Sequence, residues 1–140
     1  MRVDILTIGR LAEKPYRQLV DQYLERCRHR LPVDLVPCRD LADMRRRLPD
    51  GEVVALDEHG REMTSVEMAN WLGRKMNAGG NRLTFCLGPA EGLGDEIKGL
   101  AGEKLGLSRF TLNHQLALLV LSEQLYRSLS ILFGEPYHKA

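Results

Sequence analysis

Short apolar runs alternate with segments of helical period along this chain of 140 residues, and this alternation limits its fold more than any other feature. Runs rich in β-branched and apolar residues predict strands over residues 2–9, 33–37, 53–57 and 83–88. The stretches between them are too long for hairpins and therefore predict crossovers. We expect an α/β fold with a mainly parallel sheet.

Helical segments fill the spaces between these strands. Apolar residues recur on one helical face from Tyr16 to Cys27, directly after Pro15. Thr64 and Glu67 have the spacing of a capping box and predict the start of another helix. Shorter helices are predicted over residues 41–48 and 95–100, and a long one over about 114–133.

The long final helix carries the run LALLVL (residues 116–121), which is apolar on every side for almost two turns. A helix on the surface would expose part of this run, so we expect its own sheet and a second subunit to cover it. Farther along, Glu123, Gln124 and Arg127 form a polar stripe. The stripe is either an intrahelical Glu–Arg pair of modest stability or part of a functional site.

Composition is that of an ordinary globular protein, with 44% hydrophobic and 28% charged residues. No linker or repeat divides the chain, so we expect a single domain over residues 1–140. Cys27, Cys38 and Cys86 have no metal or redox spacing and favour a reducing, cytoplasmic setting. No signal segment or membrane span is expected, because the longest apolar run is too short to cross a bilayer.

The net charge of +1 hides a gradient, because residues 1–50 carry +3 and the remainder carries −2. The basic residues gather in two groups: Arg26, Arg28 and Arg30, and then Arg39, Arg45, Arg46 and Arg47. Such runs are usually solvated helix faces, and the alternative is a modest phosphate-contacting patch.

Three turns follow predicted strands at the edge where parallel sheets bind ligands. They are LDEHG (56–60), LGPAEGLG (87–94) and LNH (112–114), and we expect them to converge. Gly88, Gly92 and Gly94 leave the backbone of the second turn uncovered, while Glu91 disfavours a phosphate. This turn is either a site for a neutral or cationic ligand or a simple reversal of the chain.

The histidines form no Ser/His/Asp or metal-ligand pattern. His114 lies at the start of the last predicted helix, where a histidine is either a capping or packing residue or a catalyst. No further pattern supports a function for His29 or His59. Tyr137 and His138 belong to the final GEPYHKA, where chain ends normally fray. Their position alone therefore does not indicate a function, and other parts of the sequence must support one.

Five motifs occur in order: LD-x-x-G, F-x-LG-x-AEG, LS-x-x-TL-x-HQ, L-x-EQLYR-x-x-S-I and the terminal G-x-PYH. In this combination the chain resembles the RlmH family of small SPOUT-class methyltransferases, which modify large-subunit ribosomal RNA. The resemblance implies the SPOUT (α/β-knot) fold, with a trefoil knot in a cofactor-binding part of about 53–140 and a basic part of about 1–50. It also implies a homodimer with the long helix at the interface. Knots are rare, so the strand pattern alone predicts an open sheet.

The methyl donor implied by the resemblance is S-adenosylmethionine, with no metal. Carried over residue by residue, the donor pocket comprises Leu56, Gly88, Leu107, Ser108, Arg109, Phe110, Thr111 and Leu112. The donor is a sulfonium cation without a phosphate, which agrees with the missing phosphate motif. Glu91 is placed to help hold its charge.

The reaction implied is methyl transfer to N3 of a pseudouridine in 23S ribosomal RNA. Such a transfer needs two positioned reactants and removal of a ring proton. His138, Tyr137 and Glu123 are the candidate bases. Arg127 is placed to steady a substrate phosphate or the developing negative charge.

The chain leaves no room for a separate RNA-binding domain, so the basic part and the partner subunit would grip the RNA, preferably on assembled ribosomes. Three residues depart from the family pattern: Leu118 stands where arginine is usual, Pro89 replaces a glycine and Asn113 replaces a proline. Leu118 keeps an alternative open, in which a catalytically weakened knotted dimer serves as a ribosome-binding or assembly factor.

Overall fold

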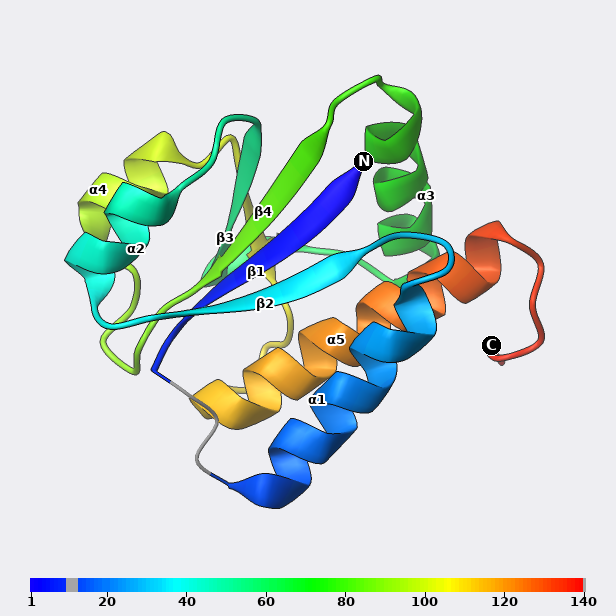
Figure 1. Ribbon diagram of the computed structural model, residues 1–140, viewed down its shortest axis with the longest axis horizontal. Helices are drawn as coiled ribbons and strands as arrows, with labels where there is room; N and C mark the ends of the chain where they lie inside the picture. Colours follow the sequence, from blue (N-terminus) through cyan, green and yellow to red (C-terminus); the bar gives the residue numbers. More distant parts are fainter. Residues whose placement is uncertain (10–12, 140) are drawn as a thin grey trace.

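A five-stranded parallel sheet forms the centre of the computed structural model, which describes residues 1–9 and 13–139 (Figure 1). The strands are β1 (Arg2–Ile8), β2 (Val33–Cys38), β3 (Glu52–Glu62), β4 (Arg82–Leu87) and β5 (Glu103–Gly106). The helices are α1 (Lys14–Cys27), α2 (Leu41–Arg47), α3 (Ser65–Asn77), α4 (Gly94–Leu100) and α5 (His114–Leu132). The predicted alternation and the parallel sheet are confirmed.

The strands lie in the order β2-β1-β4-β3-β5, and every neighbouring pair is parallel. The basic part of the chain supplies β1 and β2, and the later part supplies the other strands of the same sheet. β4 is inserted between β1 and β3, although it follows both in the sequence. Because all strands run the same way, the loops that follow them lie at one edge.

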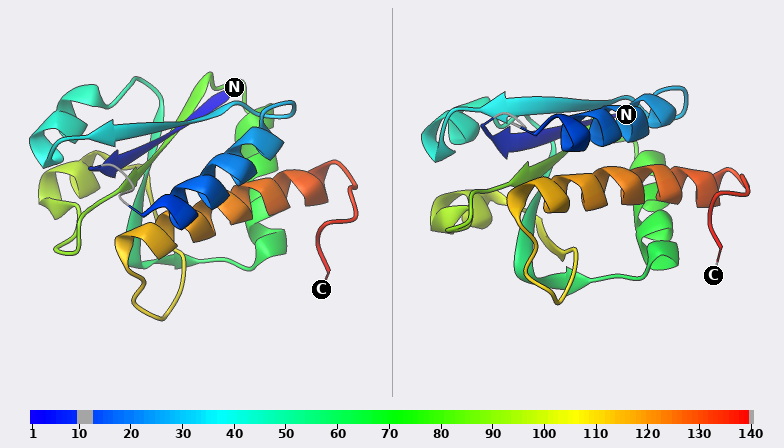
Figure 2. Two further views of the ribbon diagram at one scale, coloured as in Figure 1. Left: turned by 60° about the horizontal axis from the view of Figure 1, so that its bottom comes forward. Right: turned by 90° about the horizontal axis from the view of Figure 1, so that it is seen from below.

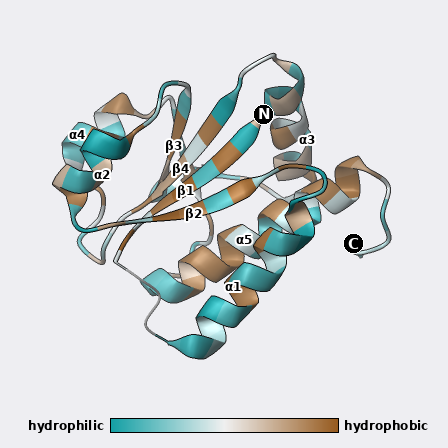
Figure 3. Ribbon diagram, in the orientation of Figure 1, coloured by the Kyte–Doolittle hydropathy of each residue, from teal (hydrophilic) through white to brown (hydrophobic). Residues whose placement is uncertain are grey.

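Helices cover both faces of the sheet, with α1, α3 and α5 on one face and α2 and α4 on the other (Figure 2). Alternate strand residues serve the two cores. Ile5 and Phe85 pack toward the three-helix face, whereas Leu6 and Cys86 pack toward the two-helix face. The central strands are therefore apolar along most of their length, as parallel strands buried on both faces require (Figure 3).

The final helix, α5, lies beside α1 and α3 on the same face of the sheet (Figure 2). Leu118, Leu121 and Leu125 are completely buried in that core. The position at which the family pattern has arginine is therefore a core position in this chain. Leu116, in contrast, remains 37% exposed at the start of the helix.

Side chains cap the starts of α2, α3 and α5, and the Asp40 carboxylate at α2 accepts from the Asp43 amide at 2.7 Å. The Thr64 hydroxyl accepts from the Glu67 amide at 3.1 Å, and the Glu67 carboxylate accepts from the Thr64 amide at 2.8 Å, so the predicted capping box is confirmed. At α5, the Asn113 side chain accepts from the Leu116 amide at 2.9 Å. The residue that replaces the family's proline is thus the N-cap of this helix.

Two strands differ from the sequence prediction. β5 is not predicted at all, because its four residues EKLG offer a single large apolar side chain, Leu105. β3 does not end at Asp57 but continues to Glu62, with a register shift between Leu56 and Arg61 where it pairs with β5. The LDEHG segment is therefore an irregular part of a strand and not a turn. The trefoil knot stays a prediction.

Candidate active site

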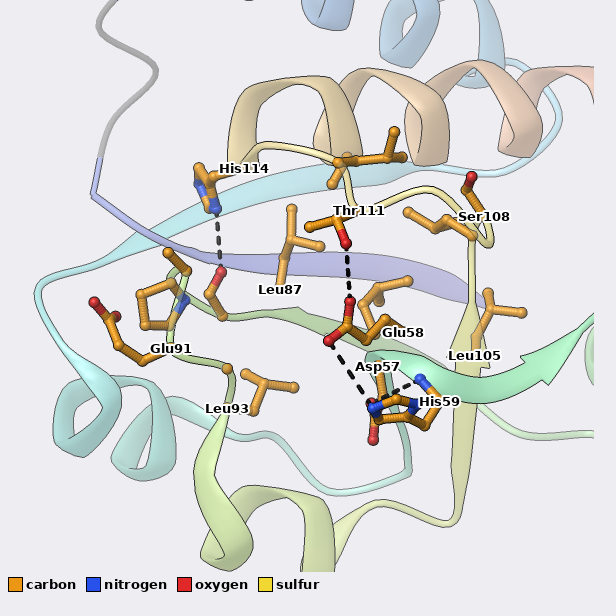
Figure 4. Close-up of a pocket in the computed structure, with 18 of the residues that line it drawn as sticks. Asp57, Glu58, His59, Leu87, Glu91, Leu93, Leu105, Ser108, Thr111 and His114 are labelled. Atoms are coloured by element: carbon orange, nitrogen blue, oxygen red, sulfur yellow. Dashed lines mark hydrogen bonds and ion pairs between the residues drawn. The ribbon is translucent and has the colours of Figure 1, made fainter.

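A cavity of about 370 Å³ opens at the carboxyl edge of the sheet (Figure 4). Its three walls are the irregular end of β3, the glycine-rich loop after β4, and the loop that leads from β5 into α5. The predicted convergence of these three segments is confirmed. The volume lies in the range of small-molecule sites.

The loop after β4 lines the cavity and turns so tightly that a side chain at Gly88 would crowd the turn itself. A Cβ atom there would lie 3.0 Å from the carbonyl carbon of Gly92 and from the side chain of Leu93. The Gly92 amide donates to the Pro89 carbonyl at 2.8 Å, which closes the turn. The Gly88 carbonyl lies 3.3 Å from Nδ1 of His114, so this loop is tied to the first turn of α5 (Figure 4).

The wall from β3 contains carboxylates. Asp57 accepts from the His59 amide at 3.0 Å and lies 3.3 Å from Nζ of Lys98. The His59 amide holds the pKa of Asp57 below its ordinary value; burial opposes this shift and Lys98 supports it. Asp57 is therefore ionised and paired at neutral pH. Glu58 and Glu91 also line the cavity, which gives it an acidic character.

The loop after β5 is held in place by its own polar groups. The Ser108 hydroxyl accepts from the Phe110 amide at 2.9 Å. The Thr111 hydroxyl donates to the Glu58 carboxylate at 3.4 Å (Figure 4). These bonds fasten the loop to itself and to β3.

Seven of the eight residues predicted to contact a donor line this cavity. They are Leu56, Gly88, Leu107, Ser108, Phe110, Thr111 and Leu112. Arg109 does not line it, because its side chain is 88% exposed and pairs with Glu62 at 3.3 Å. Contact of these residues with a donor stays a prediction.

The four predicted catalytic residues, Glu123, Arg127, Tyr137 and His138, form one group, called the tail cluster below. The Glu123 carboxylate accepts from Arg127 Nη2 and from the Tyr137 hydroxyl, each at 2.7 Å. Arg127 Nη1 lies 3.0 Å from Nδ1 of His138. The Tyr126 ring packs edge-on against Tyr137, with 4.7 Å between centroids. Tyr137 and His138 are thus anchored to α5.

The charges of the tail cluster follow from these contacts. Burial raises the pKa of Glu123, but hydrogen bonds from Arg127 and Tyr137 outweigh it, so this pKa lies below its ordinary value. Burial and hydrogen bonds with Tyr23 and Glu123 raise the pKa of Tyr137. At neutral pH Glu123 is ionised, and Tyr137 keeps its proton.

The cavity and the tail cluster lie on different halves of α5. The cavity reaches this helix at His114 and Ala117. Glu123 follows Ala117 by six residues, or about 9 Å along the axis, and the chain end lies beyond the last turn, away from the cavity loops (Figures 1 and 2). No member of the tail cluster lines the cavity. Within one chain, the structure does not bring the two predicted parts of the site together.

Other kinds of site find no support in residues 1–9 and 13–139. No three His, Cys, Asp or Glu side chains there group closely enough to hold a metal ion. Cys27, Cys38 and Cys86 are buried and free, and burial raises the pKa of Cys27 and Cys86 to about 12. These cysteines pack as small apolar residues, as expected. In the same part of the chain, no helix has the length and apolar character to span a membrane.

Several cavity residues were not singled out by the sequence patterns. Lys98 and Ala117 come from helices, and only the folded arrangement brings them to the cavity. His59 belongs to LDEHG, so its position after an apolar strand was the available signal. The contact between His114 and Gly88 shows that this histidine packs against the site, in agreement with one of the roles that its position at the helix start predicts.

A parallel sheet with a cavity at its carboxyl edge is the arrangement of α/β proteins that hold small ligands at that edge. The model of the family described as "Predicted SPOUT methyltransferase" matches residues 1–138. The chain belongs to the SPOUT methyltransferase family, which implies an enzyme that uses S-adenosylmethionine.

Two proteins named as methyltransferases are similar in sequence to almost the whole chain. The chain is 37% identical to the ribosomal RNA large subunit methyltransferase H of Phocaeicola vulgatus and 36% identical to that of Geotalea daltonii. Each match covers 99% of both proteins. A solved structure of a probable methylase family protein from Haemophilus influenzae Rd KW20 superposes on this chain with a TM-score of 0.57 at 14% sequence identity. The match covers 99% of this chain and 70% of the other, so the two share a similar fold.

Proposed function

We propose that this chain methylates N3 of a pseudouridine in 23S ribosomal RNA, with S-adenosylmethionine as the methyl donor. The cavity carries the proposal, because β3 and the loops after β4 and β5 meet around it at the ligand-binding edge of the sheet in a member of a methyltransferase family. The similar proteins of P. vulgatus and G. daltonii are named for the large ribosomal subunit, which supports an RNA of that subunit as the substrate.

The cavity suits this donor. S-adenosylmethionine, when bound, supplies a methyl group that its sulfonium sulfur makes electrophilic. The Gly88 loop would hold the donor through main-chain groups, since glycine leaves the backbone uncovered at that position. Glu58 and Glu91 would favour its positive charge. Asp57 contributes less, because it is paired with Lys98.

The tail cluster would assist loss of the proton from the ring nitrogen. Arg127 can only donate hydrogen bonds, so Nδ1 of His138 accepts and the neutral ring carries its proton on Nε2. Glu123 is occupied by Arg127 and Tyr137. We assign Arg127 and His138 as donors that stabilise the developing ring anion, while the proton leaves to solvent.

Substitution of His138 tests this assignment. His138→Gln keeps a neutral donor and is expected to retain at least a tenth of the wild-type kcat, whereas His138→Ala is expected to lose far more. The kcat should rise with pH as the substrate ring deprotonates. A kcat that requires an unprotonated histidine, together with an inactive His138→Gln, would instead assign His138 as the base.

A homodimer would bring the tail cluster of one subunit to the cavity of the other. Exposed apolar side chains on the α1 and α5 layer support such an interface: Leu19 is 42% exposed, Leu116 is 37% exposed and Phe133 is 43% exposed. Antiparallel packing of two α5 helices about a twofold axis would place the end of one beside the start of the other.

Subunit mixing tests this arrangement. Gly88→Ala impairs the cavity, and deletion of residues 136–140 removes the tail. Equal amounts of the two variants, unfolded and refolded together, would form half heterodimers, each with one intact site, and recover about a quarter of wild-type activity. Activity no higher than that of the separate variants would argue for sites built within single chains, provided that heterodimers are detected by mass.

RNA contact would come from the basic part of the chain. Around α2, the carboxylates Asp40, Asp43 and Glu96 are outnumbered by four arginines, Arg39, Arg45, Arg46 and Arg47. This excess of positive charge suits a phosphate backbone. A small surface of this kind favours the folded RNA of an assembled subunit over free transcript.

The alternative of a catalytically weakened assembly factor depended on Leu118. Its side chain is completely buried, so a missing arginine here does not leave a gap at the cavity or on the surface. We therefore favour the active enzyme.

Labelled methyl transfer to large ribosomal subunits from cells that lack this modification tests the proposed function. We expect incorporation into 23S RNA and a reverse-transcription stop, since a methyl group on N3 blocks base pairing. Calorimetry should show donor binding. Donor binding without incorporation would favour the assembly factor, and an absence of donor binding would remove the cavity proposal.

A further inference from the structure

Phe110 has the most exposed large apolar side chain of the described residues. Its surface is 82% open, whereas Val66 and Leu100, the next in order, are 47% exposed. Phe110 also contributes to the lining of the cavity. A nearly free aromatic ring therefore stands at the cavity mouth.

The loop that carries this ring is fixed on both sides of it. Before the ring, Ser108 accepts from the Phe110 amide at 2.9 Å, and Arg109 pairs with Glu62 of β3 at 3.3 Å. After it, Thr111 donates to Glu58 of β3 at 3.4 Å. The loop is therefore braced against β3 while the ring itself faces solvent. A ligand that covers the ring must approach from outside the cavity.

The charges near the ring restrict what that ligand can be. Asp57, Glu58 and Glu91 line the same cavity, and Lys98, the lysine among the lining residues, is paired with Asp57. A phosphodiester would be repelled by these carboxylates. The flat face of an uncharged nucleobase would not be repelled, and an aromatic side chain stacks on such a face.

We propose that the ring of Phe110 stacks on the target nucleobase and holds it over the donor, which makes Phe110 a substrate-positioning residue. This inference rests on the proposed function. The base would leave its stack in the RNA and enter the mouth of the cavity, while its backbone stays over basic surface outside. Because single-stranded loops give up a base at low cost, the substrate position belongs in a loop.

Four variants test the role of the ring. Phe110→Leu keeps an apolar side chain without an aromatic face, Phe110→Ala removes it, and Phe110→Tyr restores the face. Val66→Ala is the matched control, since it trims an exposed apolar side chain on α3 away from the cavity. The measurements are kcat and KM for large ribosomal subunits, donor affinity by calorimetry, and the oligomeric state by sedimentation.

Loss of one stacked base predicts a KM for subunits about 5- to 150-fold higher in Phe110→Leu and Phe110→Ala. Phe110→Tyr and Val66→Ala should stay within about twofold of wild type. Because the ring faces solvent, we expect it to contact the base in place of the donor contact that the resemblance implies for this residue, so donor affinity and sedimentation should not change. An unchanged KM in Phe110→Leu overturns the proposal. A matching loss of donor affinity would assign the ring to the donor, and a change in sedimentation would assign it to the subunit interface; either result overturns it as well.

Failure of the proposed function would be visible separately, because the wild type would then transfer no methyl group. Binding of labelled protein to subunits in the presence of S-adenosylhomocysteine still tests the ring in that case. Weaker binding of Phe110→Leu that Phe110→Tyr restores supports stacking, and equal binding of the three proteins excludes it.

Discussion

The cavity and the tail cluster lie on opposite halves of α5 and are built from different parts of the chain. Tight loops form much of the cavity, and at Gly88 even a methyl group would lie only 3.0 Å from its neighbours. Side-chain groups form the tail cluster, where one carboxylate accepts from both Arg127 and Tyr137. We therefore expect donor binding in the cavity to depend on the shape of the backbone, whereas the role of the tail cluster depends on its side-chain groups.

The largest expected effect comes from Leu118, which lies on α5 between the two regions. Leu118→Arg would bury an unpaired charge in the core, and we expect a loss of about 3–5 kcal/mol in the free energy of unfolding. Urea denaturation measures it, with Leu118→Met as the volume-conserving control. Wild-type stability in the arginine variant would mean that position 118 can reach solvent and would reopen the family's use of arginine there.

Removal of the tail separates the two regions directly. Deletion of residues 136–140 takes away Tyr137 and His138, and we expect kcat to fall by about 100-fold or more. The donor dissociation constant should stay within about twofold, because the walls that would hold the donor come from β3 and the loops after β4 and β5, whereas the partner's tail would meet the substrate. Unchanged turnover would return the tail to a structural role, and a large loss of donor affinity would break the distinction between the regions.

Gly88→Ala is the complementary change in the cavity. Its methyl group would meet the carbonyl carbon of Gly92 at 3.0 Å, and such overpacking costs about 1–3 kcal/mol. We expect donor binding about 5- to 150-fold weaker. Gly99→Ala, on the surface of α4 with nothing within 4 Å, is the control. Equal donor affinity in both variants would show that the loop adjusts and that backbone shape is not decisive.

The smallest expected effect concerns pH. The folded chain holds the pKa of Asp57 below its ordinary value of 3.8, so ionised Asp57 stabilises the fold above about pH 3.8. This contribution disappears as the pH falls through the lower, folded pKa. Asp57→Asn should lower the free energy of unfolding by about 1 kcal/mol at neutral pH. Between pH 7 and 3, the urea midpoint of this variant should fall less steeply with decreasing pH than that of the wild type.

Glu123→Gln makes the same comparison in the tail cluster. The pKa of Glu123 in the folded chain also lies below its ordinary value of 4.5. Below about pH 4.5, the urea midpoint of Glu123→Gln should therefore fall less steeply with decreasing pH than that of the wild type. Donor affinity should fall only in Asp57→Asn. If the urea midpoints of both variants depend on pH as in the wild type, neither carboxylate is stabilised in the folded state.

Sequence patterns predicted the layers and the convergent loops because each rests on local chemistry. Apolar runs identified four strands, and Thr64 with Glu67 identified the start of α3. They missed β5, whose short polar sequence becomes a strand only through pairing with β3. They also missed the continuation of β3 through LDEHG, since a polar segment with Gly60 is typical of a turn.

The candidate site was predicted unevenly for a similar reason. Motifs located the cavity residues and grouped Glu123 with Arg127, because these signals are local or carried by resemblance. The outward side chain of Arg109 and the buried one of Leu118 depend on packing against distant elements, which a motif does not record. The separation of the tail from the cavity follows from the length of α5, about 28 Å.

The place of β4 between β1 and β3 has a consequence for synthesis of the chain. β1 can pair with β2 once residue 38 has emerged from the ribosome, but its other edge pairs with β4. That edge stays open until residue 87 has also emerged. For nearly fifty residues of translation, the nascent protein carries an apolar strand edge that can pair with other chains. We expect chaperone contact to concentrate in this interval and to end when β4 completes the centre of the sheet.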